Sequence, residues 1–332
     1  MDLVETLRKK ILVLEDGDYI PGLKAVLLHI ETAFRHLSRG QDCDDDTAFT
    51  DAIYRTNQAF EGSVKEAYRV LAGQDPGKKR PYDIESYLEQ RNTFRSRVLS
   101  QLTTYRTQWR NPSAHDYKLD FDESEAFLAI VSVSAFACLL LDQIAESLAF
   151  KKSQAEAEAQ KTQLAASLAQ TLNAELLARV TDLLMQFCAT HMPPVPTPVA
   201  KQTESQLIGA LHGFLASTAP ELNVETDARM DPAEYLRADL LVVRGDERLV
   251  IEVKRRRNPQ SYEGGIAQLE HYFSVGGVKS GILLFPPDSA SEMEKLYTAV
   301  GGTNGRVVIL SPVGSSPLVN RLSAHRRSSN ET

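Results

Sequence analysis

Four short groups of residues in the last third of the chain carry side chains suited to chemistry on a phosphate ester. Glu204 begins an amphipathic stretch, Asp239 precedes a run of branched apolar residues, and Glu252-Val253-Lys254 closes a second such run. Gln268 and Tyr272 follow in the next stretch with helical spacing. Two acids, a lysine and a glutamine are the parts that can hold a divalent metal beside a phosphodiester and direct water at it.

The two apolar runs predict a β-hairpin that brings two of the acids together. Leu240–Val243 and Leu249–Val253 flank Gly245-Asp246, a dipeptide suited to a two-residue turn. That turn places Asp239 directly opposite Glu252, and opposed residues share one face of the hairpin. Because two carboxylates at this spacing repel unless a cation lies between them, we expect a hard metal here, Mg²⁺ or Mn²⁺.

Lys254 and Glu204 are predicted to complete this site. Lys254 lies two residues beyond Glu252 and therefore on the same face, where it can orient the attacking water or offset charge in the transition state. Glu204 precedes Leu207 and Ile208 by three and four residues, so it is expected to point toward the same interior side as a third metal ligand. The alternatives are a salt-bridge ladder on an exposed hairpin and a carboxylate that only stabilises a helix start.

These motifs resemble the PD-(D/E)xK, or restriction-endonuclease-like, superfamily. Asp239 follows Ala238 where the motif usually has proline, and Glu252-Val253-Lys254 matches its second half. Glu204 resembles the acid often found on the first core helix, and Gln268-Leu-Glu-His-Tyr272 resembles the Gln-x-x-x-Tyr motif of the RecB-like branch.

The resemblance implies a restriction-endonuclease-like mixed sheet flanked by helices over residues 200–327, with magnesium-dependent phosphodiester hydrolysis, usually of DNA. It implies that Lys254 and Gln268 are catalytic and that Asp239, Glu252 and Glu204 bind metal. The residues expected to bind nucleic acid there are Arg255, Arg256, Arg257 and Tyr272. For any one of the arginines the alternative is a solvated strand end.

The spacing of apolar residues predicts further elements after the hairpin. A strand over Gly281–Phe285 is expected, then a helix over Ser291–Val300 and a strand over Arg306–Leu310. A capping box of Thr203 and Gln206 is predicted around Glu204.

The first 150 residues predict an all-helical domain. Apolar residues recur at helical spacing in five segments, Leu3–Leu14, Leu23–Leu37, Phe49–Leu71, Ile84–Leu102 and Phe127–Leu148. The breaks predicted between helices are Pro21-Gly22, Asp75-Pro76-Gly77 and Arg110-Asn111-Pro112. Asp122 and Glu125 resemble a capping box for the last helix, which is predicted to continue through Ala155–Leu184.

The predicted fold class is therefore α + α/β. Residues 1–150 form the helical domain, and 151–199 form a connecting helix and a proline-rich linker at 193–198. Residues 200–327 form the mixed α/β domain, and 328–332 are a disordered tail.

The helical half contains a second candidate site, Arg110-Asn-Pro-Ser-Ala-His115. This Arg-x4-His spacing, at a predicted turn between long helices, resembles the motif of HEPN ribonucleases. The resemblance implies a homodimer through the helical half with two facing motifs and no metal requirement. His115 would act as general acid and base, Arg110 would hold the charged phosphorane, and Asn111 would hold the scissile phosphate. The alternative is a helix-end Asn-Pro turn with an exposed histidine.

Composition narrows the function classes. The net charge of −7 argues against a protein that coats nucleic acid along its whole surface. Three widely spaced cysteines fit neither a zinc site nor a disulfide framework, and no secretory pattern is evident, so a cytoplasmic location is expected. The longest apolar stretch, Ala126–Leu141, is too short to span a bilayer, so no membrane partner is expected.

Two functions follow from these patterns. In the first, the chain is an endonuclease with a DNA-cleaving module and a ribonuclease module, similar to prokaryotic defence proteins directed against phage or plasmid nucleic acid. In the second, only the C-terminal module is catalytic, and the helical half is a non-catalytic module for dimerisation and sensing.

Overall fold

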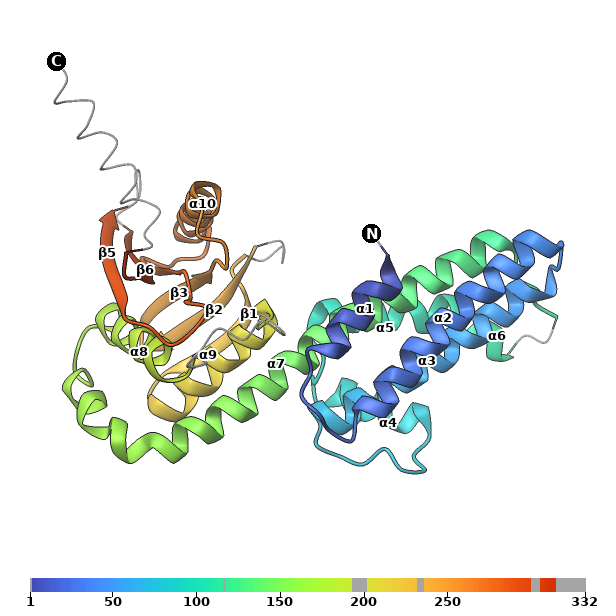
Figure 1. The fold of residues 1–332 in the computed structure, drawn as a ribbon, viewed down its shortest axis with the longest axis horizontal. Helices are drawn as coiled ribbons and strands as arrows, with labels where there is room; N and C mark the ends of the chain where they lie inside the picture. The colour runs from blue at the N-terminus through green and yellow to red at the C-terminus, as the bar shows by residue number, and fades with distance from the viewer. Residues whose placement is uncertain (1, 116–117, 193–201, 232–235, 300–304, 315–332) are drawn as a thin grey trace, which may run out of the picture. The chain divides into compact units, whose positions relative to one another are not determined.

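The computed structural model describes residues 2–115, 118–192, 202–231, 236–299 and 305–314 (Figure 1). The chain divides into two compact units, Met1–Leu148 and Ala149–Thr332. The first is helical, and the second contains a six-stranded mixed sheet with helices. The predicted α + α/β class is confirmed. The predicted proline-rich linker at 193–198 and the predicted tail at 328–332 lie outside the described residues.

The first unit is built from helices in sequential order. Their bounds are α1 (Leu3–Leu12), α2 (Ile20–Cys43), α3 (Thr47–Leu71), α4 (Pro81–Gln90), α5 (Ser96–Tyr105), a π-helical turn η1 (Arg106–Arg110), α6 (Asn111–His115) and the first part of α7 (Glu123–Gln170). The prediction of one helix over Ile84–Leu102 is wrong. The chain breaks at Asn92, whose left-handed φ of 49° interrupts helical geometry between α4 and α5.

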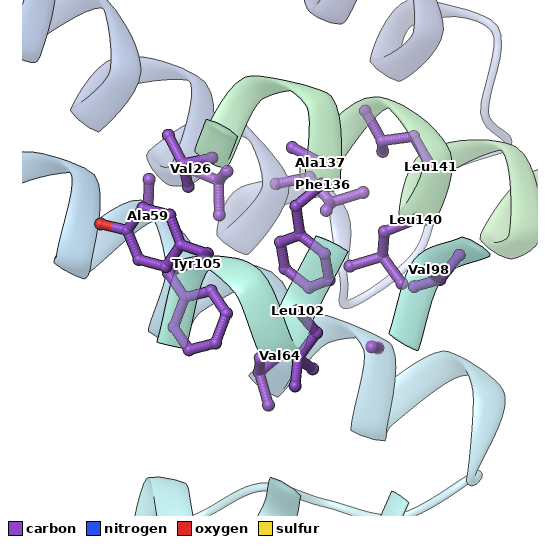
Figure 2. Close-up of a cluster of buried hydrophobic side chains, with 14 of the residues drawn as sticks. Val26, Ala59, Val64, Val98, Leu102, Tyr105, Phe136, Ala137, Leu140 and Leu141 are labelled. Atoms are coloured by element: carbon purple, nitrogen blue, oxygen red, sulfur yellow. The ribbon is translucent and has the colours of Figure 1, made fainter. Parts of the chain in front are cut away.

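Aromatic and branched side chains form the core of this unit, as Figure 2 shows. Phe136 of α7 lies among side chains from the other helices, and the centroid of its ring is 5.4 Å from that of Phe60. Phe60 also stacks on Tyr105, with ring centroids 4.8 Å apart. The Tyr105 hydroxyl lies 2.7 Å from Thr56 Oγ1 and 2.9 Å from Asn57 Oδ1 and can donate its single proton to either, so its polar end is satisfied inside the core.

Helix α7 begins at the predicted capping box, which is present. The Glu125 amide donates to the Asp122 carboxylate at 2.8 Å, and the Asp122 amide donates back to Glu125 at 3.0 Å. By length and composition α7 could cross a membrane, unlike the shorter run seen in the sequence, but half of its most apolar window is buried inside the protein. Buried core helices have this character. The predicted continuation through Leu184 is wrong, because α7 ends at Gln170 and a separate α8 (Leu176–Thr190) follows.

The second unit has its sheet between two layers of helices (Figure 1). The strands are β1 (Asn223–Arg229), β2 (Arg237–Arg244), β3 (Glu247–Val253), β4 (Ser280–Leu284), β5 (Met293–Ala299) and β6 (Arg306–Pro312), in the order β1-β2-β3-β4-β6-β5. The pairs β1–β2, β2–β3 and β5–β6 are antiparallel, whereas β3–β4 and β4–β6 are parallel. Helices α8 and α9 (Glu204–Thr218) pack on one face, and α10 (Pro259–Val275) packs on the other.

The predicted helix over Ser291–Val300 is wrong, because β5 occupies Met293–Ala299. The segment pairs antiparallel with β6 from Met293↔Pro312 to Ala299↔Arg306. Most of β6 is buried, so its backbone needs hydrogen-bond partners on both edges. Tertiary pairing therefore overrides the helix-favouring composition of the segment.

Helix α9 is held against the last part of α7 by a close backbone approach. The Ser153 hydroxyl donates to the Ala210 carbonyl at 2.7 Å. A Cβ at Gly213 would lie 2.3 Å from the Phe150 carbonyl oxygen, so only glycine fits there. This contact fixes the helix that begins with Glu204.

Candidate functional site

The hairpin that carries two of the predicted site residues has the expected turn. The ladder of β2 and β3 runs from Arg244↔Glu247 to Leu240↔Ile251, around a turn in which Gly245 has a φ of 59°. Every pair in this ladder has the predicted register, and the last one lies one position before Asp239 and Glu252, which the same register places opposite each other. The Asp239 side chain accepts a backbone hydrogen bond at this end of the hairpin, with 2.7 Å between its Oδ2 and the Val253 amide nitrogen.

Asp239 and Glu252 bring two carboxylates together at this end of the hairpin. Glu252 is only 3% exposed, and Asp239 is partly buried. Burial and the charge of Glu252 raise the pKa of Asp239 to about 7, with a smaller contribution from Glu204. The Val253 amide and the charge of Lys254 oppose this increase in the pKa. A cation beside these carboxylates would relieve the repulsion that raises the pKa.

Both oxygens of Glu252 have partners in the structure. Lys254 Nζ donates to Oε1 at 2.7 Å. The Tyr272 hydroxyl lies 3.1 Å from Oε2 and 2.8 Å from the Arg237 carbonyl, and its single proton can be donated to either oxygen. Burial and the charge of Glu252 raise the pKa of Tyr272 well above its usual range, and Gln268 forms a side-chain hydrogen bond with it. Helix α10 therefore orients a strand carboxylate.

Glu204 is brought near this site but not into the interior. It is exposed in the first turn of α9, so the prediction that it points inward is wrong. The predicted capping box of Thr203 and Gln206 is present and fixes the helix start. Position 204 therefore lies at the end of the helix rather than on the buried stripe that begins at Leu207. Its charge still contributes to the raised pKa of Asp239.

The described side chains offer two carboxylates to a metal rather than three. Over the described residues, no group of three or more His, Cys, Asp or Glu side chains is placed to hold a metal ion. Asp239 and Glu252 fit a magnesium-type site even so, because Mg²⁺ is commonly held by one or two carboxylates and keeps several waters.

The three arginines that follow Lys254 differ in their surroundings. Arg255 and Arg256 are exposed just beyond β3. Arg257 is also exposed, but its Nη2 pairs with Asp288 at 2.8 Å. Two of the three predicted phosphate contacts are therefore presented to solvent, and the third is engaged within the protein.

The sequence interpretation missed an ion pair beside the site. Arg237 Nη1 contacts Asp227 at both the carbonyl (2.7 Å) and Oδ2 (2.9 Å). Asp227 has a left-handed φ of 51°, which is uncommon for a residue with a side chain. The Arg237 carbonyl also lies 2.8 Å from the Tyr272 hydroxyl, so the Arg237–Asp227 ion pair helps to position the hydroxyl that orients Glu252. The available signal was an arginine two residues before Asp239.

The Arg110–His115 segment has a different local structure from the predicted turn. The chain stays helical from α5 through η1 into α6, because a wide π-helical turn accommodates Pro112, which has no amide proton to donate. Arg110 Nη1 donates to Asn111 Oδ1 at 3.1 Å, and its Nη2 lies 3.7 Å from Glu61. His115 is exposed at the end of α6.

A cavity of about 560 Å³ opens beside Arg110 in the helical unit. Helix α3 supplies most of its lining, α2 supplies His36, and the η1–α6 segment supplies Arg110 and Ala114. The cavity thus brings Arg110 together with polar residues far away in the sequence. His115 does not line it.

Comparison with known proteins adds no relative: no family model, no curated protein and no solved structure matches this chain.

Proposed function

We propose that the second unit is a metal-dependent endonuclease that hydrolyses phosphodiester bonds, with DNA as its substrate. The observation that carries the proposal is the pair Asp239 and Glu252, where burial and then the charge of Glu252 raise the pKa of Asp239 to about 7. Lys254 contacts Glu252 of this pair directly. The likeness to the PD-(D/E)xK superfamily rests on these same residues, and Gln268 and Tyr272 extend it.

Each residue has a role that follows from its position. Asp239 and Glu252 would hold Mg²⁺ or Mn²⁺, which supplies charge stabilisation at the phosphate and acidifies water when bound. Lys254, 2.7 Å from Glu252, can orient the attacking water or donate to a phosphate oxygen. Tyr272 and its partner Gln268 keep the Glu252 carboxylate in one orientation, as groups behind a metal ligand do.

Nucleic acid would reach the site past the basic segment after β3. Arg255 and Arg256 are exposed there and can contact backbone phosphates, which gives affinity without reading sequence. The negative net charge of the chain confines such contacts to a local patch. We place this activity in the cytoplasm, in defence against phage or plasmid nucleic acid.

The proposal is tested by incubating the full chain with plasmid DNA, with either Mg²⁺ or EDTA present. We expect cleavage with Mg²⁺ alone, and a loss of about 100-fold or more in Asp239→Asn. Asp246→Asn in the exposed turn of the same hairpin is the matched control and should cleave at the wild-type rate. Equal rates for Asp239→Asn and wild type would remove the assignment.

A second candidate function belongs to the helical unit. Arg110 lines a cavity and His115 is exposed on the adjoining helix, so both side chains are accessible for metal-independent RNA cleavage in a homodimer. In the alternative, the helical unit only dimerises and senses. This alternative, in which the helical unit is not catalytic, is favoured because His115 does not line the cavity at which Arg110 lies.

A further inference from the structure

The cavity beside Arg110 has the size and the lining of a small-molecule site. Its volume of about 560 Å³ lies within the roughly 300–1,000 Å³ of typical ligand pockets. Asp51, Tyr54, Arg55, Gln58 and Glu61 recur on α3 at spacings of three and four residues, so one face of that helix forms the wall. Most of the residues that line the cavity are of polar or charged types, unlike the apolar residues between the core helices.

Two guanidinium groups line the cavity and have N–H donors available to an anion, one from α3 and one from η1. Arg55 is exposed and has no ion pair among the residues that the structure describes. Arg110 Nη1 donates to the amide oxygen of Asn111 at 3.1 Å and its Nη2 lies 3.7 Å from Glu61, so the five N–H groups of its guanidinium are only partly used. Planar guanidinium groups match the geometry of phosphate oxygens.

His36 of α2 adds a neutral polar group to the lining of the cavity. Burial, followed by the charges of Arg39, Arg55 and Arg35, lowers its pKa against the opposing effect of Asp51, whose carboxylate is 3.8 Å away. The imidazole can therefore donate or accept a hydrogen bond near neutral pH.

An aromatic side chain lies next to these cations. Tyr54 is 52% exposed although it is large and apolar, and it precedes Arg55 on α3. Exposed tyrosines beside arginines are the surfaces on which bases stack in nucleotide-binding proteins. Asp51 and Gln58 can hydrogen-bond the polar edge of a base.

We propose that this cavity binds a nucleoside monophosphate unit, with the phosphate at Arg55 and Arg110 and the base against Tyr54. The site belongs to the helical unit and is independent of the proposed metal site. It gives the helical unit a ligand to sense, whether that ligand is a free nucleotide or the nucleotide at the end of a single strand.

The test measures binding of AMP, GMP and UMP to the full chain by titration calorimetry. Adenosine and inorganic phosphate are controls, and an RNA tetranucleotide represents the strand end. We expect at least one nucleotide to bind about tenfold tighter than adenosine or phosphate alone, because both of its parts have a partner in the cavity. Tighter binding of the tetranucleotide would identify a strand as the source, and tighter binding of the mononucleotide would identify the free molecule.

Variants locate the binding in the cavity. Arg55→Ala should weaken binding about 10-fold to 100-fold, the range for a lost hydrogen bond to a charged group. Tyr54→Ala should weaken it at least about fivefold, and Tyr54→Phe should retain it. Arg97→Ala removes one exposed positive charge from α5 outside the cavity and is the matched control. The absence of nucleotide binding at millimolar concentration, or an equal effect of Arg97→Ala and Arg55→Ala, would overturn the proposal.

Discussion

Replacing Asp239 with asparagine should stabilise the metal-free protein at alkaline pH. The folded protein raises the pKa of this carboxyl to about 7, first through burial and then through Glu252, whereas the unfolded chain ionises it at an ordinary aspartate pKa. Asparagine is neutral, similar in shape, and can still accept the Val253 amide that Asp239 accepts at 2.7 Å. The substitution thus removes the electrostatic cost and keeps the hydrogen bond.

The direction of the pH dependence follows from proton linkage. Below about pH 4 Asp239 is protonated in both states, so its ionisation costs the folded state nothing. Between about pH 4 and 7 the unfolded chain has released a proton that the folded chain still holds, so wild-type stability falls over this range and levels off above pH 7. At about 1.4 kcal/mol per pH unit the ceiling is about 4 kcal/mol, and partial exposure of Asp239 with Lys254 close by reduces this to about 1–2 kcal/mol.

Calorimetric melting of the full chain in EDTA measures the effect. At pH 8 the transition of the second unit should rise by about 2–8 °C in Asp239→Asn, and at pH 4.5 the two proteins should melt within about a degree of each other. Asp246→Asn should show no such pH-dependent gain. Saturating Mg²⁺ should reverse the order at pH 8, because binding at 100 times the dissociation constant stabilises wild type by about 2.7 kcal/mol. A variant that is less stable than wild type in EDTA at pH 8 would refute the reasoning.

Four further predictions concern the residues around the two candidate sites. Tyr272→Phe should weaken Mg²⁺ affinity about 10-fold or more by releasing Glu252, and unchanged affinity by calorimetry would show that the hydroxyl does not orient the carboxylate. The double variant Arg255→Ala and Arg256→Ala should reduce the slope of log affinity for DNA against log salt concentration by about two, measured by fluorescence titration. Arg257→Ala should reduce this slope less, because Arg257 is already paired with Asp288. If the helical unit is a ribonuclease, RNA cleavage should survive EDTA, leave 2′,3′-cyclic phosphate ends and fall about 100-fold in His115→Ala; cleavage that persists in this variant would make the helical unit a scaffold. Light scattering at micromolar concentration should give the mass of a homodimer, and a monomer would remove the composite ribonuclease cleft.

Sequence patterns predicted the parts of the fold that depend on short-range signals. The turn at Gly245-Asp246 fixed the hairpin register, and the capping boxes at Asp122 and Thr203 marked helix starts, because each depends on residues within a few positions of one another. The β5 strand could not be predicted from such local signals, because only pairing with β6 makes an extended conformation favourable there.

The candidate site shows the same division between local and tertiary information. The contact of Lys254 with Glu252 is local to one strand end, and the alternation of residues along a strand predicts it. The hydrogen bond from the Val253 amide to Asp239 joins the two strands of the hairpin, and the contact of Tyr272 with the Arg237 carbonyl needs helix α10 to pack beside them. Neither contact follows from spacing within one element. Glu204 was misplaced because helical spacing gives a direction for its side chain but not the point at which the helix passes the edge of the core.

Titration of the full chain with Mn²⁺ by calorimetry tests the central claim most directly, because that claim is a divalent-cation site at Asp239 and Glu252. We predict saturable binding that Mg²⁺ competes for, that disappears in Asp239→Asn and Glu252→Gln, and that is unchanged in the hairpin-turn control Asp246→Asn. Mn²⁺ binding of equal affinity in Asp239→Asn and wild type would contradict the account, as would the absence of any binding to wild type at millimolar Mn²⁺.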